Sequence, residues 1–137
     1  MRNAPKAFEA YLNSKAGIKY FGEVPDALEY MSGYAIMVVP LLSGSGMRVK
    51  IIEAMAAGKT IISTTIGAEG NEGKHNQHFL IANTVHDFAK HVLLAMNSKK
   101  RCNSIGNNAR NLVLKKFDTF AVAKELKDFY LARQKMK

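Results

Sequence analysis

Residues 37–65 read MVVPLLSGSGMRVKIIEAMAAGKTIISTT, and this stretch decides the fold of the chain. The β-branched run up to Val39 stops at Pro40, which has no N–H for a sheet ladder, so a strand should end there. Apolar side chains then recur at helical spacing over residues 47–56, and a second β-branched run follows at 61–64. The pattern predicts strand, loop, helix and strand, which is a right-handed parallel βαβ unit.

The loop between the first strand and the helix is residues 43–46, SGSG. Its glycines permit positive φ, and its small side chains let an anion approach the backbone N–H groups. Ligands of parallel sheets bind at the carboxyl ends of the strands, next to the positive end of a helix. Arg48 and Lys50 stand at the start of the predicted helix, where cations oppose the dipole unless an anion is bound. We expect an anion at residues 44–50, and a bound diphosphate would remove this conflict; the alternative is that both basic side chains are simply solvated.

Two better-known phosphate-binding motifs are excluded because each lacks a glycine. Residues 57–60, AGKT, imitate the end of a Walker A loop, but the glycine required five positions before Gly58 is replaced by Glu53. Residues 44–46, GSG, could open a dinucleotide-binding fingerprint, but its third glycine would fall on Val49. The expected anion site therefore belongs to neither class.

The same stretch resembles the nucleotide-sugar-binding half of GT-B-fold retaining glycosyltransferases, the family called glycosyl transferases group 1. That family includes sucrose and glycogen synthases and many bacterial polysaccharide enzymes. In the family, one glutamate meets the donor sugar hydroxyls and a second, eight positions later, accepts hydrogen bonds from the ribose. Glu53 matches the second glutamate and Ser45 stands at the first, so the chain looks like the subgroup with Gly-Ser-Gly-Met/Thr-Arg-x-Lys. The likeness rests on residues 40–42, 44–46, 50–59 and 64–67.

Glu53 suits the ribose on physical grounds as well. A carboxylate in an otherwise apolar helix only accepts hydrogen bonds, as a vicinal diol requires; the alternative is a solvated residue paired with Lys50. The turn at Gly22 and Glu23 lies near the nucleotide base in the family, although a simple turn would explain it equally well. The resemblance thus implies a set of donor-binding residues and assigns no catalytic residue: Gly22, Glu23, Gly44, Ser45, Gly46, Met47, Arg48, Lys50 and Glu53.

We predict an α/β fold, a three-layer Rossmann-like domain with a parallel sheet of about four strands. The resemblance implies that residues 1–137 are the C-terminal, donor-binding half of a GT-B fold. We expect the N-terminal acceptor domain and the first strands of this domain to be absent from the chain. The strands are expected at residues 18–21, 35–39, 60–64 and 79–82.

Helices are predicted at residues 6–12, 24–31, 85–96, 99–116 and 119–133. The second should have Pro25 in its first turn, and the third should be capped by Thr84. The last helix is apolar on more than one face. In the family that the chain resembles, the last helix crosses back to the absent domain, so the resemblance implies that part of its surface is uncovered. Buried stripes are expected at Val85, Phe88, Ala89, Val92, Leu93 and Met96 on the third helix and at Ile105, Ala109, Leu112 and Val113 on the fourth.

Residues 67–78 form a glycine-rich polar loop on the same edge of the sheet as the anion site. The loop could face a ligand, and Gly67-Ala68-Glu69 resembles a Gly-x-Glu segment of the family; surface mobility is the equal alternative. His75 and His78 have no cysteine or suitably spaced carboxylate beside them, so no metal is expected there.

Composition limits the class of protein and its partners. With 137 residues, 47% of them apolar and 23% charged, the chain has the composition of one soluble globular domain. Its only cysteine, Cys102, excludes a disulfide framework, and no apolar run approaches about 20 residues, so we expect a cytoplasmic protein without a signal peptide. The net charge of +9 and the basic tail would suit peripheral contact with an anionic membrane at its inner face, although a solvated charged tail explains them too.

The function implied by the resemblance is binding of a nucleoside-diphosphate sugar for retaining transfer to a glycan or lipid-linked acceptor in bacterial surface polysaccharide synthesis. No metal or other cofactor is expected, because the helix start and basic side chains take the place of a cation. This chain alone is predicted to be inactive. The alternatives are a nucleotide-sensing regulatory domain and a non-catalytic basic module that binds nucleic acid or anionic membrane. The lysines are spread over several helices without interleaved aromatic residues, so no nucleic acid partner is expected.

Overall fold

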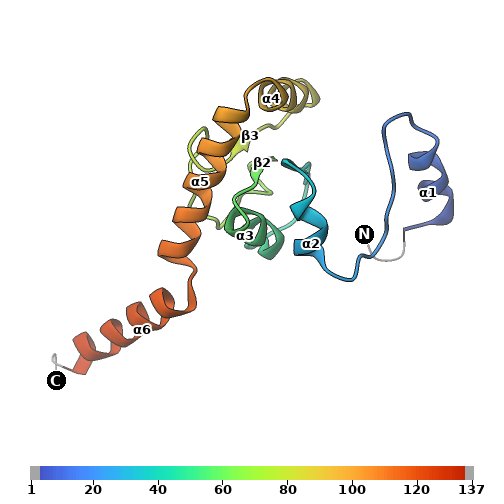
Figure 1. Ribbon diagram of the computed structural model, residues 1–137. Helices are drawn as coiled ribbons and strands as arrows, with labels where there is room; N and C mark the ends of the chain where they lie inside the picture. Colours follow the sequence, from blue (N-terminus) through green and yellow to red (C-terminus); the bar gives the residue numbers. More distant parts are fainter. Residues whose placement is uncertain (1–3, 135–137) are drawn as a thin grey trace.

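The computed structural model describes residues 4–134, in which a small parallel sheet is enclosed by helices (Figure 1). The sheet has three strands in the order β1-β2-β3, and its α/β class and parallel direction are as predicted. The strands are β1 (Ile36–Val39), β2 (Thr60–Ser63) and β3 (Leu80–Ile81). The helices are α1 (Lys6–Asn13), α2 (Ala27–Ser32), α3 (Val49–Ala56), α4 (Val85–Asn97), α5 (Lys99–Lys116) and α6 (Thr119–Gln134).

The predicted βαβ unit is β1, α3 and β2. Its two strands pair in parallel, with Ile36 opposite Thr60 and Val39 opposite Ser63, so both strands end at the same edge of the sheet. Since the two strands are parallel, a crossover must connect them, and α3 forms it. The loop at residues 43–46 therefore leaves the carboxyl end of β1 and leads directly into α3.

The core lies on both faces of β2, which is buried along its whole length. Successive strand residues point to opposite faces. Ile61 therefore joins a cluster with Ile51 and Met55 of α3 and with Ala109 of α5. Ile62 faces the other way, and its cluster is formed by Leu80, Ala82 and Ile105, against which Phe88 and Val92 of α4 pack. This arrangement is the predicted three-layer domain.

The expected strand at residues 18–21 is wrong. In the described chain this segment pairs with no strand, and Tyr20 instead donates its backbone N–H to the Asn13 side chain at 3.0 Å. A segment of strand-forming residues becomes a β-strand only where a neighbouring strand can accept and donate its backbone hydrogen bonds. Without such a neighbour, its composition is not enough to form a strand. The sheet accordingly has three strands and not four.

The second helix also starts later than predicted. It begins at Ala27, because the Asp26 carboxylate accepts the backbone N–H groups of Leu28 at 2.7 Å and Glu29 at 3.0 Å. Asp26 is therefore the cap, and Pro25 lies before the helix instead of in its first turn.

The predicted buried stripe agrees with the structure on α5 and agrees only in part on α4. On α5, whose bounds match the prediction, Ile105, Ala109 and Val113 are buried and Leu112 is half-buried. On α4 the Thr84 cap is confirmed, since its hydroxyl accepts the Asp87 N–H at 3.1 Å. The buried stripe predicted for α4 includes more residues than are buried in the structure. The reason is that β3 has only two residues and offers little surface for α4 to cover. Phe88 and Val92 are half-buried, whereas Val85, Ala89, Leu93 and Met96 are exposed.

The last helix, α6, extends away from the body of the molecule and packs mainly against α5 (Figure 1). Asp118 caps its start by accepting the Phe120 N–H at 2.9 Å. The expectation of an uncovered apolar surface is confirmed. Within residues 4–134 there is no helix with the length and apolar character needed to cross a bilayer. The exposed large apolar residues of α6 are Phe120, Val122, Leu126, Phe129, Tyr130 and Leu131.

Candidate functional site

The loop after β1 has the backbone conformation that its glycines make possible. Gly44 has φ +130° and Gly46 has φ +80°, values in the region that L side chains rarely adopt. Both glycines follow the carboxyl end of β1 at Val39 and precede the start of α3. The predicted anion loop therefore lies where parallel sheets bind their ligands.

Arg48 folds back over this loop. Its Nη1 donates to the Ser45 carbonyl at 2.7 Å, and a Cβ on Gly44 would collide with Nη2. The Arg48 Nε is buried and has no hydrogen-bond partner. The helix begins at Val49, so Arg48 and Met47, which the sequence placed inside it, come before it. The guanidinium is thus held against the glycine loop by the chain itself.

The start of α3 has no side-chain cap. The helices α2, α4 and α5 are each capped by a side-chain oxygen, from Asp26, Thr84 and Ser98. The Arg48 side chain offers donors only, so it cannot cap the helix, although the Arg48 carbonyl accepts the Ile51 N–H at 2.9 Å. The N–H groups of Val49 and Lys50 are left available for an anion, and the Lys50 side chain is exposed in the first turn.

A cavity of about 360 Å³ connects α3 to the segment before α2. Gly22, Lys50 and Glu53 all line it, so three predicted site residues from two distant stretches lie together. We call it the Gly22–Glu53 cavity. Phe21 and Tyr30 supply aromatic rings to its wall, with their centroids 5.2 Å apart. Glu23, although predicted as a site residue, is not among the lining residues.

A second cavity, of about 590 Å³, adjoins the glycine loop at Gly44. Its wall includes Glu69 and His75 from the loop at residues 67–78, so the ligand-facing alternative for that loop has a structural basis. We call it the Glu69–His75 cavity. Thr65, just past β2, and Ile81 of β3 also line it. Sequence reasoning missed Thr65, whose position just after a strand end at the ligand edge was the signal that could have found it.

His75 is fixed in one orientation in this wall. Its Nδ1 accepts the Ile81 backbone N–H at 2.8 Å. Burial lowers the pKa of His75, and the neighbouring His91 and Arg101 lower it further. A neutral imidazole whose Nδ1 accepts carries its proton on Nε2, which is therefore a donor. Across the part of the chain that the structure covers, no group of three or more His, Cys, Asp or Glu is placed to hold a metal.

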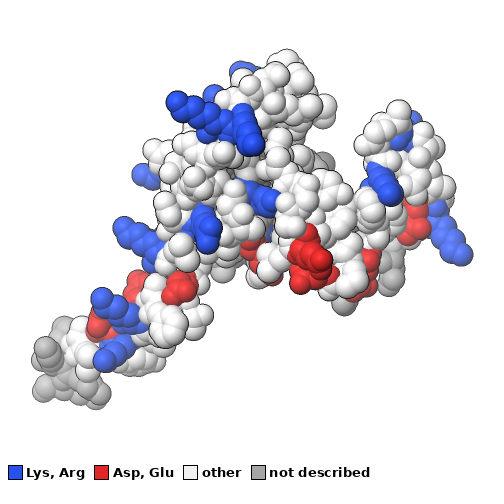
Figure 2. Space-filling model, viewed as in Figure 1, with Lys and Arg blue, Asp and Glu red and all other residues white. Residues whose placement is uncertain are grey.

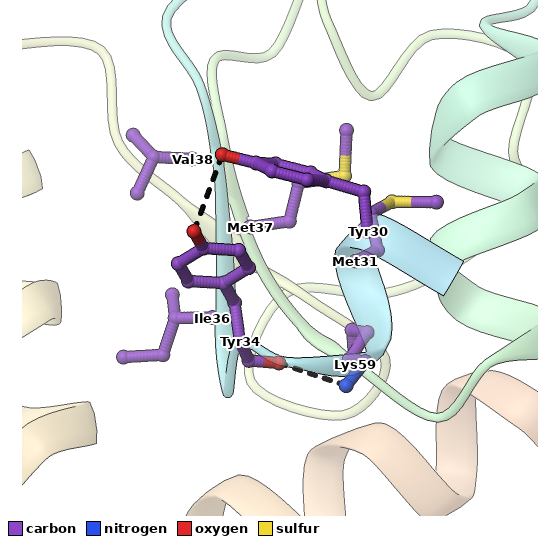
Figure 3. Close-up of a pocket in the computed structure, with 7 residues that line it drawn as sticks. All are labelled: Tyr30, Met31, Tyr34, Ile36, Met37, Val38 and Lys59. Carbon is purple, nitrogen blue, oxygen red and sulfur yellow. Dashed lines mark hydrogen bonds between the residues drawn. The ribbon is translucent and has the colours of Figure 1, made fainter. Parts of the chain in front are cut away.

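A third cavity, of about 280 Å³, lies at β1 and contains none of the predicted site residues (Figure 3). Figure 3 shows the Tyr30 and Tyr34 hydroxyls joined by a hydrogen bond, at 3.2 Å, beside the strand. Lys59 donates to the carbonyls of Tyr34 at 2.8 Å and Ser32 at 3.0 Å. The lysine of the AGKT segment is thus engaged in hydrogen bonds that connect the end of α2 to the start of β2. Gly58, with φ +69°, follows the end of α3.

A family comparison decides the identity of the chain. The sequence model of the family described as glycosyl transferases group 1 matches residues 2–98, which is well over half of the chain. The chain belongs to this family. A similar curated relative is an uncharacterized 44.6 kDa protein in the cps region of Klebsiella pneumoniae, 31% identical over 87 residues. That match covers 64% of this chain and 22% of the relative.

Two solved structures resemble this group 1 domain. One is HepE from Anabaena in complex with UDP, with a TM-score of 0.73 at 16% identity, covering 83% of this chain and 32% of HepE. The other is a sucrose-phosphate synthase from Thermosynechococcus elongatus, with a TM-score of 0.73 at 20% identity, covering 96% of this chain and 34% of that one. These likenesses confirm the predicted GT-B-type fold. The chain spans about a fifth of the curated relative and a third of each solved protein.

Proposed function

We propose that this chain binds a nucleoside-diphosphate sugar and is the C-terminal donor-binding part of a retaining glycosyltransferase. The observation that carries the proposal is the uncapped start of α3, with a glycine loop and Arg48 before it and Lys50 in its first turn. Such a start offers N–H groups and positive charge to a diphosphate. Arginine adds a planar donor fork, and lysine adds a point charge.

The nucleoside occupies the Gly22–Glu53 cavity in this proposal. Glu53 is half-buried in its wall and has only acceptor oxygens, which suit the two ribose hydroxyls. Phe21 and Tyr30 provide rings against which a base can pack. Gly22, with φ +66°, gives the turn that brings this wall to α3.

The Arg48 and Lys50 charges and the α3 start compensate the diphosphate, so no metal is part of the proposal. HepE has been solved in complex with UDP, and this complex supports the choice of a nucleoside diphosphate as ligand. The cps-region relative supports a role in bacterial surface polysaccharide synthesis. We assign the acceptor site to an N-terminal domain, since the relatives are long enough to contain one. We also propose a cytoplasmic location, where a nucleotide-sugar donor would be available.

A basic module for nucleic acid or membrane is less well supported. Figure 2 shows Lys and Arg side chains scattered over helices at both ends of the chain, with no continuous basic patch on that face. Binding to a polyanion through charge would need such a patch or groove.

Thermal unfolding with candidate ligands tests the proposed function. At physiological salt, UDP, GDP or ADP should raise the melting temperature, and a single-stranded oligonucleotide should not. Arg48→Ala should abolish most of the shift with both nucleoside diphosphate and pyrophosphate, whereas Arg110→Ala, on the exposed side of α5, should retain it. Two results would contradict the proposed function: a rise in melting temperature with the oligonucleotide alone, or an equal rise with nucleoside diphosphate in Arg48→Ala and Arg110→Ala.

A further inference from the structure

The Glu69–His75 cavity has no place in the proposed nucleoside site. It shares no lining residue with the Gly22–Glu53 cavity. The two cavities adjoin the glycine loop and α3 at different points. The Gly22–Glu53 cavity is lined by Lys50 and Glu53 of α3, and the Glu69–His75 cavity is lined by Gly44 of the loop. A ligand centred on residues 44–50 can therefore extend in two directions.

We propose that the Glu69–His75 cavity holds the sugar of the donor and that it selects a neutral hexose over a uronic acid. The inference rests on the proposed function, because it needs a diphosphate at the start of α3. A nucleotide sugar carries its diphosphate in the middle, with the nucleoside on one side and the sugar on the other. With the nucleoside in the Gly22–Glu53 cavity, the remaining cavity next to Gly44 receives the sugar.

The lining has the chemistry that a hexose ring requires. Glu69 accepts hydrogen bonds from hydroxyl groups, and the Nε2–H of His75 donates one. Apolar surface from Ile66, Phe79 and Ile81 lies beside these groups and matches the C–H faces of a sugar. The volume of about 590 Å³ falls in the range of roughly 300–1,000 Å³ found for small-molecule sites.

The wall is held in place by the chain. The Asn83 side chain accepts the Thr65 N–H at 2.9 Å and donates to the Thr65 hydroxyl at 3.0 Å. A Cβ on Gly73 would collide with the buried Phe79 ring, so the loop packs closely against the cavity floor. Thr65 and His75, held by these contacts and by the bond to Ile81, can bind without a large ordering cost.

The sign of the charge determines the preferred sugar. Glu69 is the charged residue of the lining, with His75 neutral, and the Arg48 guanidinium lies at the Gly44 end, where the diphosphate is proposed to bind; the sugar part of the cavity therefore presents one negative charge. The carboxylate of a uronic acid would be repelled there, whereas the hydroxyls of a hexose satisfy the Glu69 oxygens.

Calorimetric titration of the 137-residue chain with UDP, UDP-glucose and UDP-glucuronate tests this inference, with GDP and GDP-mannose as a parallel pair. UDP-glucose should bind about tenfold tighter than UDP, since hydrogen bonds to a charged group are gained. Glu69→Gln should remove most of this gain, leave UDP unchanged and narrow the gap between UDP-glucose and UDP-glucuronate. The matched control is Glu72→Gln, because Glu72 is exposed, pairs with Lys116 at 3.2 Å and lies outside the cavity lining.

Three results overturn the inference while leaving the proposed function intact: equal affinity for UDP and UDP-glucose in the wild-type chain, tighter binding of UDP-glucuronate than of UDP-glucose, or identical behaviour of Glu69→Gln and Glu72→Gln. Failure of UDP, GDP and ADP to bind at all is a distinct result. It overturns the proposed function and the sugar site together.

Discussion

Arg48 and Gly44 form a matched pair at the start of α3. The missing Cβ at Gly44 leaves room for the Arg48 guanidinium, and the Ser45 carbonyl holds that guanidinium at 2.7 Å. A donor fork fixed before the ligand arrives loses little side-chain freedom on binding. The residue before this helix is therefore one whose side chain contacts the glycine loop, and not one whose side-chain oxygen caps the helix. We propose that Arg48 completes an anion site and does not cap the helix.

Glu53→Gln should weaken UDP binding more than pyrophosphate binding, because only UDP carries the ribose diol that the carboxylate is proposed to accept. Loss of a charged acceptor costs about 1.5–3 kcal/mol, which corresponds to roughly 13- to 160-fold in affinity. Titration calorimetry of both ligands measures the difference. Glu29→Gln on the exposed side of α2 is the control. Equal losses for UDP and pyrophosphate would take Glu53 out of the ribose site.

Sequence reasoning located Gly44, Gly46, Lys50 and Glu53 on a loop and a helix that the structure confirms. It could do so because positive φ restricts a loop to glycine and because helical spacing fixes which residues share a turn. The direction of the Arg48 side chain was not predictable, since it depends on the shape of the loop that it contacts.

Among the elements, the segment before α2 shows what pattern reading misses. Residues 18–21 have strand-forming composition, but the strand that would complete their ladder is lacking in the part described. Their placement across a cavity from α3, with Gly22 and Glu53 both in its lining, depends on tertiary structure, because the two stretches are about 30 residues apart. Local periodicity therefore predicted the βαβ unit and could not predict the cavity wall opposite it.

Gly106→Ala should destabilise the protein, because α5 crosses the end of α3 without space for a side chain. A Cβ on Gly106 would collide with the Gly58 carbonyl, and both groups are backbone that cannot rotate away. Overpacking of this kind costs about 1–3 kcal/mol. Gly33→Ala is the matched control, since φ there is −72° and a Cβ would meet the Tyr30 carbonyl at 3.7 Å, an ordinary contact. Equal melting temperatures for the two variants would contradict this packing.

The contact between His75 and β3 should make stability depend on pH. Burial, with His91 and Arg101, lowers the pKa of His75 in the folded chain. Between that lowered pKa and the unfolded value of about 6.5, the unfolded chain binds more protons, so stability falls as the pH falls below about 6.5. Protonated Nδ1 also cannot accept the Ile81 N–H. Melting temperatures at pH 7.5 and 5.5 should differ less in His75→Gln than in the wild type or in His86→Gln; the same difference in all three would refute this coupling.

The whole molecule exposes more surface than its mass predicts. Its accessible area is 10144 Å² at 15.1 kDa, whereas a compact monomer of that mass exposes about 7,100 Å². The helices α1 and α6 project from the body (Figure 1), and α6 carries exposed Phe120, Phe129 and Tyr130. A helix that is apolar on several sides is typical of one that a second surface covers.

This open form leads to the expectation that the 137-residue chain binds donor but transfers no sugar. Orienting an acceptor against the donor accounts for roughly 7–11 kcal/mol in well-aligned reactions, and that requires a second wall for the site. The measurement is incubation of a radiolabelled nucleotide sugar with lipid-linked and soluble acceptors. Product above the buffer control would show that the acceptor site lies within these residues.

The central claim, a nucleoside diphosphate bound at the start of α3, is tested most directly by titrating UDP, GDP and ADP into the ¹⁵N-labelled chain. Backbone amide signals of Gly44, Gly46, Val49 and Lys50 should shift first and most with one of these ligands, with those of Gly22 and Glu53 following. Pyrophosphate should move the loop signals alone. Shifts centred on the cavity at β1 around Tyr34 and Lys59, or no shift with any ligand at millimolar concentration, would contradict the account.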